Sequence, residues 1–292
     1  MKALLIGANG QLGRTLSQFV PGNVSLEALD LPAIDITDRE RVEKIVSAVL
    51  PDVIINTAAY TAVDRAEDEL SLAFSINADG PKNLAKAAVE YSARLIHIST
   101  DYVFDGTACR PYPPDAVCNP LGVYGKSKWE GEKQVQSIID DHVIVRTSWL
   151  YSRYGNNFVL TMLRLMREKK ELRVVADQIG SPTWAATLAD AIWRIAVKPE
   201  LTGTYHWSDA GVASWYDFAV AIQEEAIGLG ILDHGIPIHP IASKDYPQKA
   251  KRPFYSVLGC QHSWHDLDVV PMNWRIALRN AIGYMHAVTG ET

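Results

Sequence analysis

Stretches with strand-like and helical spacing alternate along the first half of the chain. Five runs, most of them rich in Leu, Ile and Val, have the length of buried strands and span residues 2–6, 24–29, 52–56, 94–98 and 142–146. Amphipathic stretches follow, ending near residues 20, 50 and 91, and a further helix begins near 124. This alternation predicts an α/β fold with a doubly wound parallel sheet.

The second half has a less regular pattern. Helical spacing recurs at 156–169, 185–197 and 214–228, and strand-like runs lie near 173–176, 203–207 and 237–241. No charged linker separates the halves, so we expect them to pack closely. Residues 1–150 should form the sheet domain. Residues 151–292 should form mainly a smaller α/β lobe over the carboxyl edge, with some segments returning to the sheet.

The composition limits the classes of function. Of the 292 residues, 48% are hydrophobic and 21% are charged, which is ordinary for a globular protein. The net charge of −6 and the lack of a dense Lys/Arg run argue against a nucleic-acid partner. Apolar runs are too short for a signal peptide or a membrane span. Three cysteines suggest free thiols in a reducing compartment, so we expect a cytoplasmic protein.

A glycine-rich turn joins the first strand to the first helix. Gly7, Gly10 and Gly13 are spaced so that the backbone could approach a pyrophosphate at the helix N-terminus. The next strand ends in Asp30, where an acceptor for a ribose 2′-hydroxyl is expected. No Lys or Arg lies between Asp30 and Asp38, which favours NADH over NADPH. The first half therefore reads as a dinucleotide-binding Rossmann domain.

Small and hydroxyl-bearing residues follow two other strands. The small residues in 57–61 leave room for a flat ligand, and Ser99 and Thr100 end the strand at 94–98. A hydroxyl there can donate a hydrogen bond to a substrate carbonyl, although a turn or helix cap is the plainer reading. No helical pattern follows Thr100, and the Pro- and Gly-rich segment 106–120 predicts a mobile active-site loop.

Two local details can be checked against the structure. Thr37 and Glu40 fit a capping box that opens a helix ending near Leu50. Asn77 interrupts the apolar face of a long helix that ends near Tyr91, and we expect it to be a core asparagine satisfied by backbone groups.

Tyr124 and Lys128 stand four residues apart in the predicted helix, on one face of it. A lysine charge roughly 5 Å from a phenol stabilises the phenolate by about 3 kcal/mol at an effective dielectric near 20. The sequence thus predicts a phenol pKa lowered toward neutrality and a role for Tyr124 in general acid/base catalysis. A surface Tyr/Lys pair is the plainer reading of this spacing alone.

These motifs occur in the order found in extended short-chain dehydrogenase/reductases, which the chain resembles. Within that group it is similar to the dTDP-4-dehydrorhamnose reductase family in five further segments. They are Thr61-Ala62-Val63-Asp64, Ser99 to Phe104, Arg146-Thr147-Ser148-Trp149, Gly155-Asn156-Asn157-Phe158 and Asp177 to Thr183.

The resemblance implies a role for each matching residue. Catalysis is implied for Thr100, Tyr124 and Lys128. Cofactor contacts are implied for Gly7, Gly10, Gln11, Leu12, Gly13, Asp30, Asp35, Ile36, Ala58, Ala59, Tyr60, Thr61, Ile98, Tyr124 and Lys128. Contacts with a nucleotide sugar are implied for Val63, Asp64, Thr100, Asp101, Trp149, Asn157 and Arg252. The later residues would then form a substrate-binding lobe.

The implied reaction is the NADH- or NADPH-dependent reduction of the 4-keto group of dTDP-4-dehydro-6-deoxy-L-mannose to dTDP-L-rhamnose. Tyr124 would give the proton, and Thr100 would hydrogen-bond to the same oxygen. Some relatives are dimers bridged by magnesium through glutamates. The first helix here reads Gly13-Arg14-Thr15-Leu16, without such a glutamate. A homodimer is therefore possible, but a magnesium bridge is doubtful.

Other readings stay open at the level of sequence. A nucleotide-sugar epimerase or dehydratase of the same superfamily is one, although Tyr102 stands where a dehydratase usually carries glutamate. A non-catalytic, dinucleotide-binding regulatory subunit is another. Cys260, His262, His265 and Asp266 lack a second paired ligand group, so we expect no metal site. Trp184, Trp207 and Trp215 are further candidates for the border of the substrate cleft.

Overall fold

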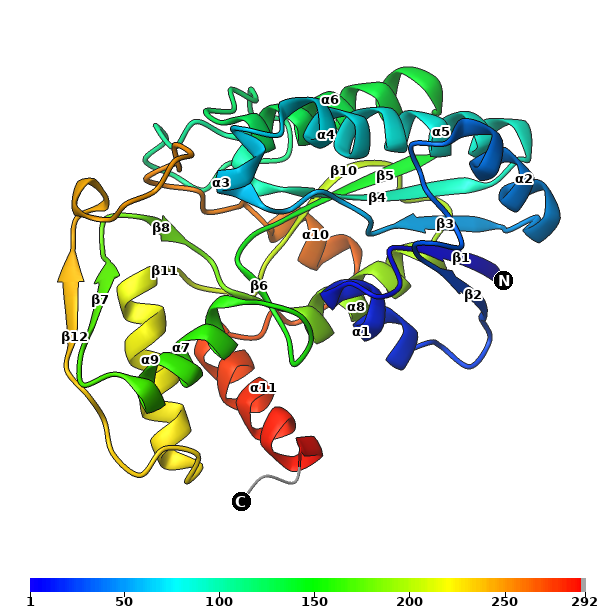
Figure 1. Ribbon diagram of the computed structural model, residues 1–292. Coiled ribbons are helices and arrows are strands. Elements are labelled where there is room, and N and C mark those ends of the chain that lie inside the picture. The colour runs from blue at the N-terminus through cyan, green and yellow to red at the C-terminus, as the bar shows by residue number, and fades with distance from the viewer. Residues whose placement is uncertain (290–292) are drawn as a thin grey trace.

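The computed structural model describes residues 1–289 and is built around a six-stranded sheet (Figure 1). The strand order is β10-β5-β4-β3-β1-β2, and every neighbouring pair is parallel. The strands are β1 (Lys2–Ile6), β2 (Ser25–Leu29), β3 (Val53–Asn56), β4 (Arg94–Thr100), β5 (His142–Thr147) and β10 (Gly203–Trp207). The predicted doubly wound α/β sheet is confirmed.

Helices cover both faces of the sheet, because most of its strands are apolar on both faces. One face carries α2 (Arg39–Val49), α4 (Leu70–Phe74), α5 (Gly80–Glu90) and α6 (Val123–Ile138), seen along the top of Figure 1. The other carries α1 (Gln11–Gln18) and α8 (Ala185–Ala196), with α10 (Gln261–Asp266) beside β10. Leu4, Ile54 and Leu95 pack under the first layer, and Leu5, Ile55 and Ile96 under the second.

A second lobe has its own apolar core beyond the carboxyl edge of the sheet. It contains α7 (Phe158–Glu168), α9 (Trp215–Gly228) and α11 (Trp274–Thr289), grouped at the lower left of Figure 1. Three short strand pairs accompany them: β7 (Leu172–Val175) with β12 (Ile238–Ile241), β8 (Ile179–Gly180) with β11 (Ala213–Ser214), and β6 (Leu150–Tyr151) with β9 (Thr183–Trp184). Val159, Phe218 and Leu278 are buried between the helices.

The strand β10 links the two halves of the chain. It lies on the outer side of β5 although it follows the whole of α7 and α8 in sequence. Arg94 in β4 reinforces this link, because its guanidinium donates to the carbonyl oxygens of Ile195 and Lys198 at 2.8 and 2.9 Å. The late segments thus complete the sheet as well as the second lobe.

Three local predictions differ from the structure. The N-cap of α2 is Asp38, whose carboxylate accepts from the Arg41 amide at 3.1 Å, whereas the Thr37 hydroxyl donates to Asp35. The expected long helix is divided into α3 (Val63–Ala66), α4, the π-helix η1 (Ser75–Asp79) and α5. A 3-10 turn, η2 (Asp101–Val103), follows Thr100 where no helix was expected.

Asn77 lies inside the π-helix and is a satisfied core asparagine, as predicted. Its oxygen accepts from the Tyr60 amide at 2.8 Å, and its nitrogen donates to the Tyr60 carbonyl and to the Ser127 hydroxyl, both at 3.0 Å. One side chain therefore ties the loop after β3 to helix α6.

The segment 106–120 is attached to the body of the protein at several points. Tyr112 is buried and forms a β-bridge with Leu258, and Arg146 donates to the Pro114 carbonyl at 3.0 Å.

The cysteines Cys109, Cys118 and Cys260 are free. Within the part of the chain that the structure describes, no helix has both the length and the apolar character needed to cross a membrane. A further 3-10 turn, η3 (Ser243–Asp245), precedes the segment that closes over α3.

Candidate active site

A cavity of about 990 Å³ runs along the carboxyl edge of the sheet, where open α/β sheets bind their ligands. Its walls come from the turn between β1 and α1, the loop after β2, the ends of β3, β4 and β5, and helix α6. The predicted site residues in its lining are Gly7, Gly10, Gln11, Leu12, Gly13, Asp30, Asp35, Ile36, Ala58, Ala59, Thr61, Val63, Ile98, Thr100, Asp101, Tyr124, Lys128 and Trp149.

The turn after β1 needs glycine for close backbone approach. Gly7 has φ +84°, and a Cβ there would lie 2.5 Å from the Ala58 amide nitrogen. A Cβ on Gly13 would collide with the Gly7 carbonyl oxygen. Gly10 caps α1 without a side chain, so the first N–H groups of the helix stay available to an anion. The close packing of this turn and its uncapped N–H groups at the cavity edge fit the pyrophosphate of a dinucleotide.

Asp30 holds the neighbouring loops together at the edge of the cavity. Its carboxylate accepts from the Asn9 amide at 2.8 Å and from the Leu31 amide at 2.7 Å. Two guanidinium groups anchor the same loops: Arg14 donates to the Asn9 carbonyl at 3.0 Å, and Arg41 to the Ala33 carbonyl at 2.8 Å. Both lie outside the interval between Asp30 and Asp38, so the sequence argument against a 2′-phosphate did not consider them.

Tyr60 is turned away from the cavity, unlike its neighbours Ala59 and Thr61. Its hydroxyl donates to Glu69 at 2.6 Å, and its backbone is held by Asn77. Tyr60 therefore braces the wall against α4 instead of lining it. Hydrogen bonding to Glu69 is the main reason that the pKa of Tyr60 is raised.

Thr100, Tyr124 and Lys128 meet at the centre of the cavity. Thr100 caps η2, accepting from the Tyr102 amide at 3.2 Å, and its hydroxyl donates to the Asp101 carboxyl at 3.1 Å. Burial raises the pKa of Tyr124 to about 12, against the lowering effect of the neighbouring Thr100 hydroxyl. The expectation of a phenol pKa near neutrality is therefore wrong for this structure.

The reason lies in the direction of the Lys128 side chain. Its amine donates to the Ile98 carbonyl at 2.7 Å and approaches His97, which places it against β4. Burial lowers the pKa of Lys128 to about 8, and the nearby Glu132 carboxylate opposes that shift. A phenol that stays protonated at neutral pH suits a proton donor, which must carry its proton before the reaction begins.

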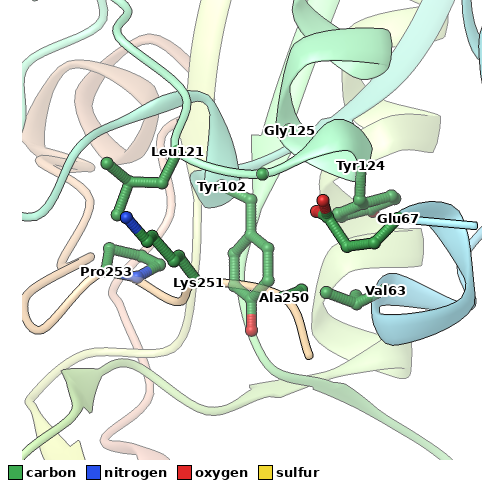
Figure 2. A pocket seen from close by; sticks show the side chains of 10 residues that line it. Val63, Glu67, Tyr102, Leu121, Tyr124, Gly125, Ala250, Lys251 and Pro253 are labelled. Carbon is green, nitrogen blue, oxygen red and sulfur yellow. The ribbon is translucent and has the colours of Figure 1, made fainter. Parts of the chain in front are cut away.

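Asp101 and Tyr102 extend the site beyond Thr100. Asp101 is 2% exposed, and burial raises the pKa of its carboxyl to about 7. The ring of Tyr102 meets that of Tyr124 edge-on, with centroids 5.7 Å apart and planes at 76°. Figure 2 shows Tyr102 beside a small cavity of about 10 Å³, with Lys251 and Pro253 on one side of its ring and Val63 on the other. Tyr102 was not among the predicted contact residues.

Asp64 and Arg252 form an ion pair next to this small cavity. Arg252 donates to the Asp64 carboxylate at 2.7 Å and to the side-chain oxygen of Gln248 at 2.6 Å. The same carboxylate accepts from the amides of Lys249 and Ala250 at 3.1 and 3.0 Å. Asp64 thus closes the segment 249–252 over α3, and neither charged group lines the main cavity.

An aromatic wall forms the other end of the cavity. Trp149 and Trp215 stack with ring centroids 3.6 Å apart and planes at 8°, and both line the cavity. Trp149 adopts φ +47°, in the left-handed region that is uncommon for large residues. Gly180 leaves room for its ring, because a Cβ there would lie 2.6 Å from the indole. Of the three further tryptophans considered from sequence, Trp215 alone reaches this lining.

Asn157 has a structural role next to the cavity. It caps α7, accepting from the Leu160 amide at 3.1 Å, and its nitrogen donates to Gln11 at 3.0 Å and to the Ser152 carbonyl at 2.7 Å. The neighbouring Asn156 lines the cavity in its place. Other lining residues outside the predicted set include Ser148, which belongs to the segment Arg146-Thr147-Ser148-Trp149, and Ser75 and Ile76, which carry no motif.

No group of three or more potential metal ligands occurs among residues 1–289. His262 and His265 each pair with Asp266, at 3.3 and 3.1 Å, while Cys260 is buried and contacts the Ser208 hydroxyl. This segment therefore packs α10 against the sheet and holds no metal-binding arrangement.

Comparison with known proteins shows the family of the chain. The family model described as "RmlD substrate binding domain" matches residues 1–286. A dTDP-4-dehydrorhamnose reductase of Aggregatibacter actinomycetemcomitans is 42% identical over 290 residues, covering 97% of this chain and 99% of that protein. A dTDP-4-keto-6-deoxy-D-glucose reductase of Streptomyces niveus is 39% identical, with 97% of each chain covered.

A solved structure shows the same architecture. The dTDP-4-dehydrorhamnose reductase of Bacillus anthracis, crystallised in complex with NADP, superimposes with a TM-score of 0.90 at 38% identity. The match covers 96% of this chain and 98% of that one. With its glycine cradle and its buried Thr-Tyr-Lys centre, the chain belongs to the RmlD substrate binding domain family, the family of the dTDP-4-dehydrorhamnose reductases.

Proposed function

We propose that this protein reduces the 4-keto group of dTDP-4-dehydro-6-deoxy-L-mannose to a hydroxyl, giving dTDP-L-rhamnose. The placement of Thr100 and Tyr124 carries this proposal, because it puts two hydroxyls together in the lining of the cavity that begins at the glycine turn. A carbonyl oxygen that accepts from both would be polarised and ready to receive a proton. The names of the relatives supply the nucleotide and the sugar.

The residues of this chain divide the work of the reduction. A nicotinamide dinucleotide, when bound, supplies the hydride for sugar C4. Thr100 donates a hydrogen bond to the C4 oxygen and stabilises the negative charge that develops there. Tyr124 gives its phenolic proton to that oxygen, which closes the new hydroxyl and leaves a phenolate. Lys128 lines the same cavity, but its amine is held by the Ile98 carbonyl, so it does not lower the pKa of the phenol in this structure.

The dinucleotide contacts follow from the shape of the first half of the cavity. The free N–H groups at the start of α1 would hold the pyrophosphate, and Asp30 would face the adenosine ribose. Asp35 and Ile36 would border the adenine, while Ala59 and Thr61 leave space for the nicotinamide half. Asp30 favours NADH, and Arg14 and Arg41 beside its loop are the cations available for NADPH.

The sugar nucleotide would occupy the second half of the cavity, against the lobe formed by the later residues. Asp101, Trp149 and Val63 line the cavity and would contact the sugar. Asp64, Arg252 and Asn157 act behind this surface: the first two hold the segment 249–252, and Asn157 holds Gln11 at the start of α1.

One observation supports a second candidate substrate, a dTDP-linked keto sugar of the D series. The relative named for dTDP-4-keto-6-deoxy-D-glucose is nearly as similar to this chain as the one named for dTDP-4-dehydrorhamnose. Oxidation of NADH and NADPH should therefore be followed with both dTDP keto sugars and with UDP and GDP analogues. Consumption with the L-sugar supports the proposal. Consumption with the D-sugar alone would change the substrate, and tightly held NAD without net turnover would indicate an epimerase.

Two further properties are part of the proposal. The free thiols of Cys109, Cys118 and Cys260 support a cytoplasmic location, where such thiols stay reduced. A homodimer without a metal bridge is the expected assembly, which sedimentation in the presence of a chelator would test.

A further inference from the structure

A row of buried polar side chains lies directly behind Lys128. The lysine amine is 3.5 Å from Nε2 of His97, and the other ring nitrogen of His97 is 3.1 Å from the side-chain nitrogen of Asn56. His97 and Asn56 are 0% exposed, and Lys128 is 1% exposed. Three neighbouring elements, β3, β4 and α6, thus each contribute one member of the row.

The direction of the first hydrogen bond is set by the backbone. The Ala58 amide donates to Oδ1 of Asn56 at 3.1 Å, so this oxygen marks the accepting end of the amide. The amide nitrogen of Asn56 therefore faces His97, and it can only donate. Nδ1 of His97 must accept, and a neutral imidazole then carries its hydrogen on Nε2.

This tautomer presents a donor to Lys128. An ammonium has three N–H donors and no acceptor, so Nε2–H and a charged lysine repel each other. A neutral amine has a lone pair that can accept from Nε2–H while the lysine still donates to the Ile98 carbonyl. Burial and the lysine charge lower the pKa of His97 well below its ordinary value, so the ring stays neutral.

We propose that Asn56 and His97 are positioning residues that make Lys128 a ready proton source for the catalytic phenol. The proposal rests on the reductase function proposed above. When an N–H proton leaves Lys128 to re-form the phenol O–H of Tyr124, the neutral amine left behind accepts from Nε2–H of His97, and a proton from solvent then restores the ammonium.

Other charged groups near Lys128 act on the same equilibrium. Glu132 stands one turn further along α6 and favours the ammonium. It is shared with Arg146 of β5, which donates to it at 2.7 Å, and with the Ser99 hydroxyl. Tyr124 stands one turn earlier in α6. The row from Asn56 thus opposes Glu132, and the balance between them sets how readily Lys128 loses its proton.

His206 is a matched comparison within the same protein. It is also 0% exposed, but its Nδ1 lies 3.0 Å from the Tyr112 carbonyl and its Nε2 3.3 Å from the Arg146 guanidinium. A carbonyl only accepts and a guanidinium only donates, so His206 carries its hydrogen on Nδ1. The two buried histidines should therefore be opposite tautomers.

The first test needs no turnover. Long-range ¹H–¹⁵N correlation spectra of the full-length protein, labelled at histidine, should show His97 with hydrogen on Nε2 and His206 with hydrogen on Nδ1. Assignment uses the His97→Gln and His206→Gln variants. An Nδ1–H tautomer at His97 would overturn the proposal even if the reductase activity is present, and its failure is thus distinct from failure of the proposed function.

The second test reverses the direction of the hydrogen bonds along the row. In Asn56→Asp, a carboxylate accepts from both Ala58 and Nδ1–H of His97, so Nε2 becomes an acceptor for Lys128. The alkaline limb of the kcat profile should move to higher pH by at least about one unit, a tenfold change in proton affinity. The neutral variant His97→Gln should move it in the same direction, whereas His142→Gln, at the start of β5 with its ring bonded to the Ile139 carbonyl, should leave it in place. If neither Asn56→Asp nor His97→Gln moves the limb, the row does not act on Lys128.

Discussion

Trp149 and Trp215 stack face to face at the end of the cavity that is lined by the second lobe, with 3.6 Å between ring centroids. Trp149 stands in a backbone conformation with φ +47°, and the stack with Trp215 holds its indole over the cavity. The wall that would receive the sugar is thus made by two residues from different parts of the chain.

We expect Trp215→Ala to weaken sugar binding. Loss of the stack removes aromatic contact and lets Trp149 leave its position, so KM for the keto sugar should rise about tenfold or more with a smaller change in kcat. Steady-state kinetics at saturating cofactor measures the effect. Trp129→Ala is the control, because Trp129 lies beside Lys133 away from the cavity. An unchanged KM for Trp215→Ala would show that the aromatic wall does not contact the sugar.

The catalytic assignment predicts different effects for the two hydroxyls. Tyr124→Phe removes the proton donor and should lower kcat by about 10²–10⁴-fold. Thr100→Val removes one hydrogen bond to the developing oxyanion and should lower it by up to about 10²–10³-fold. Binding of the dinucleotide, followed by protein fluorescence, should change little in either variant. Full turnover in Tyr124→Phe would exclude the phenol as the donor.

The glycine turn predicts selective loss of cofactor binding. Gly13→Ala places a methyl group against the carbonyl of Gly7 and should displace the turn that faces the pyrophosphate. The dissociation constant for the dinucleotide should rise at least about tenfold. Gly22→Ala is the matched control, since no atom lies within 4 Å of a Cβ at that position. Equal affinities in the two variants would show that the turn does not contact the cofactor.

Asp101 should make stability depend on pH. Burial raises the pKa of its carboxyl from 3.8 to about 7, so between these values the folded protein holds a proton that the unfolded chain has released. The free energy of unfolding should therefore fall as pH rises through this window, by up to roughly 1.4 kcal/mol per unit, and level off above it.

Urea unfolding of Asp101→Asn should show a shallower slope than the wild type between pH 4 and 7. Asp209→Asn is a useful comparison, because burial raises the pKa of Asp209 to about 7 as well, at the start of α8. Both variants should lose part of the slope in stability, but only Asp101→Asn should also alter the pH dependence of kcat/KM. Parallel slopes for Asp101→Asn and the wild type would contradict the buried, protonated carboxyl.

The pair of Asp64 and Arg252 predicts an effect on substrate affinity. Asp64→Ala removes the ion pair and two backbone acceptor contacts, so the segment 249–252 should loosen. Because Asp64 is 45% exposed, the loss of stability should be modest, about 1 kcal/mol or less. KM for the nucleotide sugar should rise several-fold at nearly constant kcat.

Glu171→Ala is the control for that prediction, since it breaks a more exposed pair, with His239, on the far strands of the second lobe. If both variants leave KM unchanged, the segment 249–252 does not contribute to the substrate site.

Residue spacing predicted the sheet and much of the candidate site. The apolar runs identified the strands because both faces of a parallel sheet are buried, and the glycines identified the turn because a Cβ does not fit there. The direction of the Lys128 side chain could not be predicted in this way. Its position in α6 places it on the face of Tyr124, but the carbonyl of Ile98 and the ring of His97 draw its amine toward β4.

Other parts depend on contacts between distant segments. Trp215 reaches the cavity because α9 packs against α7, and Arg252 meets Asp64 because the chain returns over α3. Neither relation has a local signal in the sequence. The π-helix at Ser75–Asp79 also lacks a local signal. Asn77 could be identified as a polar residue on an apolar helix face, but the wider helical turn that directs it toward Tyr60 could not be predicted.

The position of β10 restricts how this protein can be rebuilt. A chain cut after residue 150 would leave β5, with all six residues buried, as an exposed edge, and would remove the three carbonyl partners of Arg94. Chimaeras made by joining the first half of one relative to the second half of another would therefore pair β5 of one protein with β10 of the other inside the sheet. Grafts meant to change sugar preference should exchange segments on either side of 203–207 and keep that strand with its native front half.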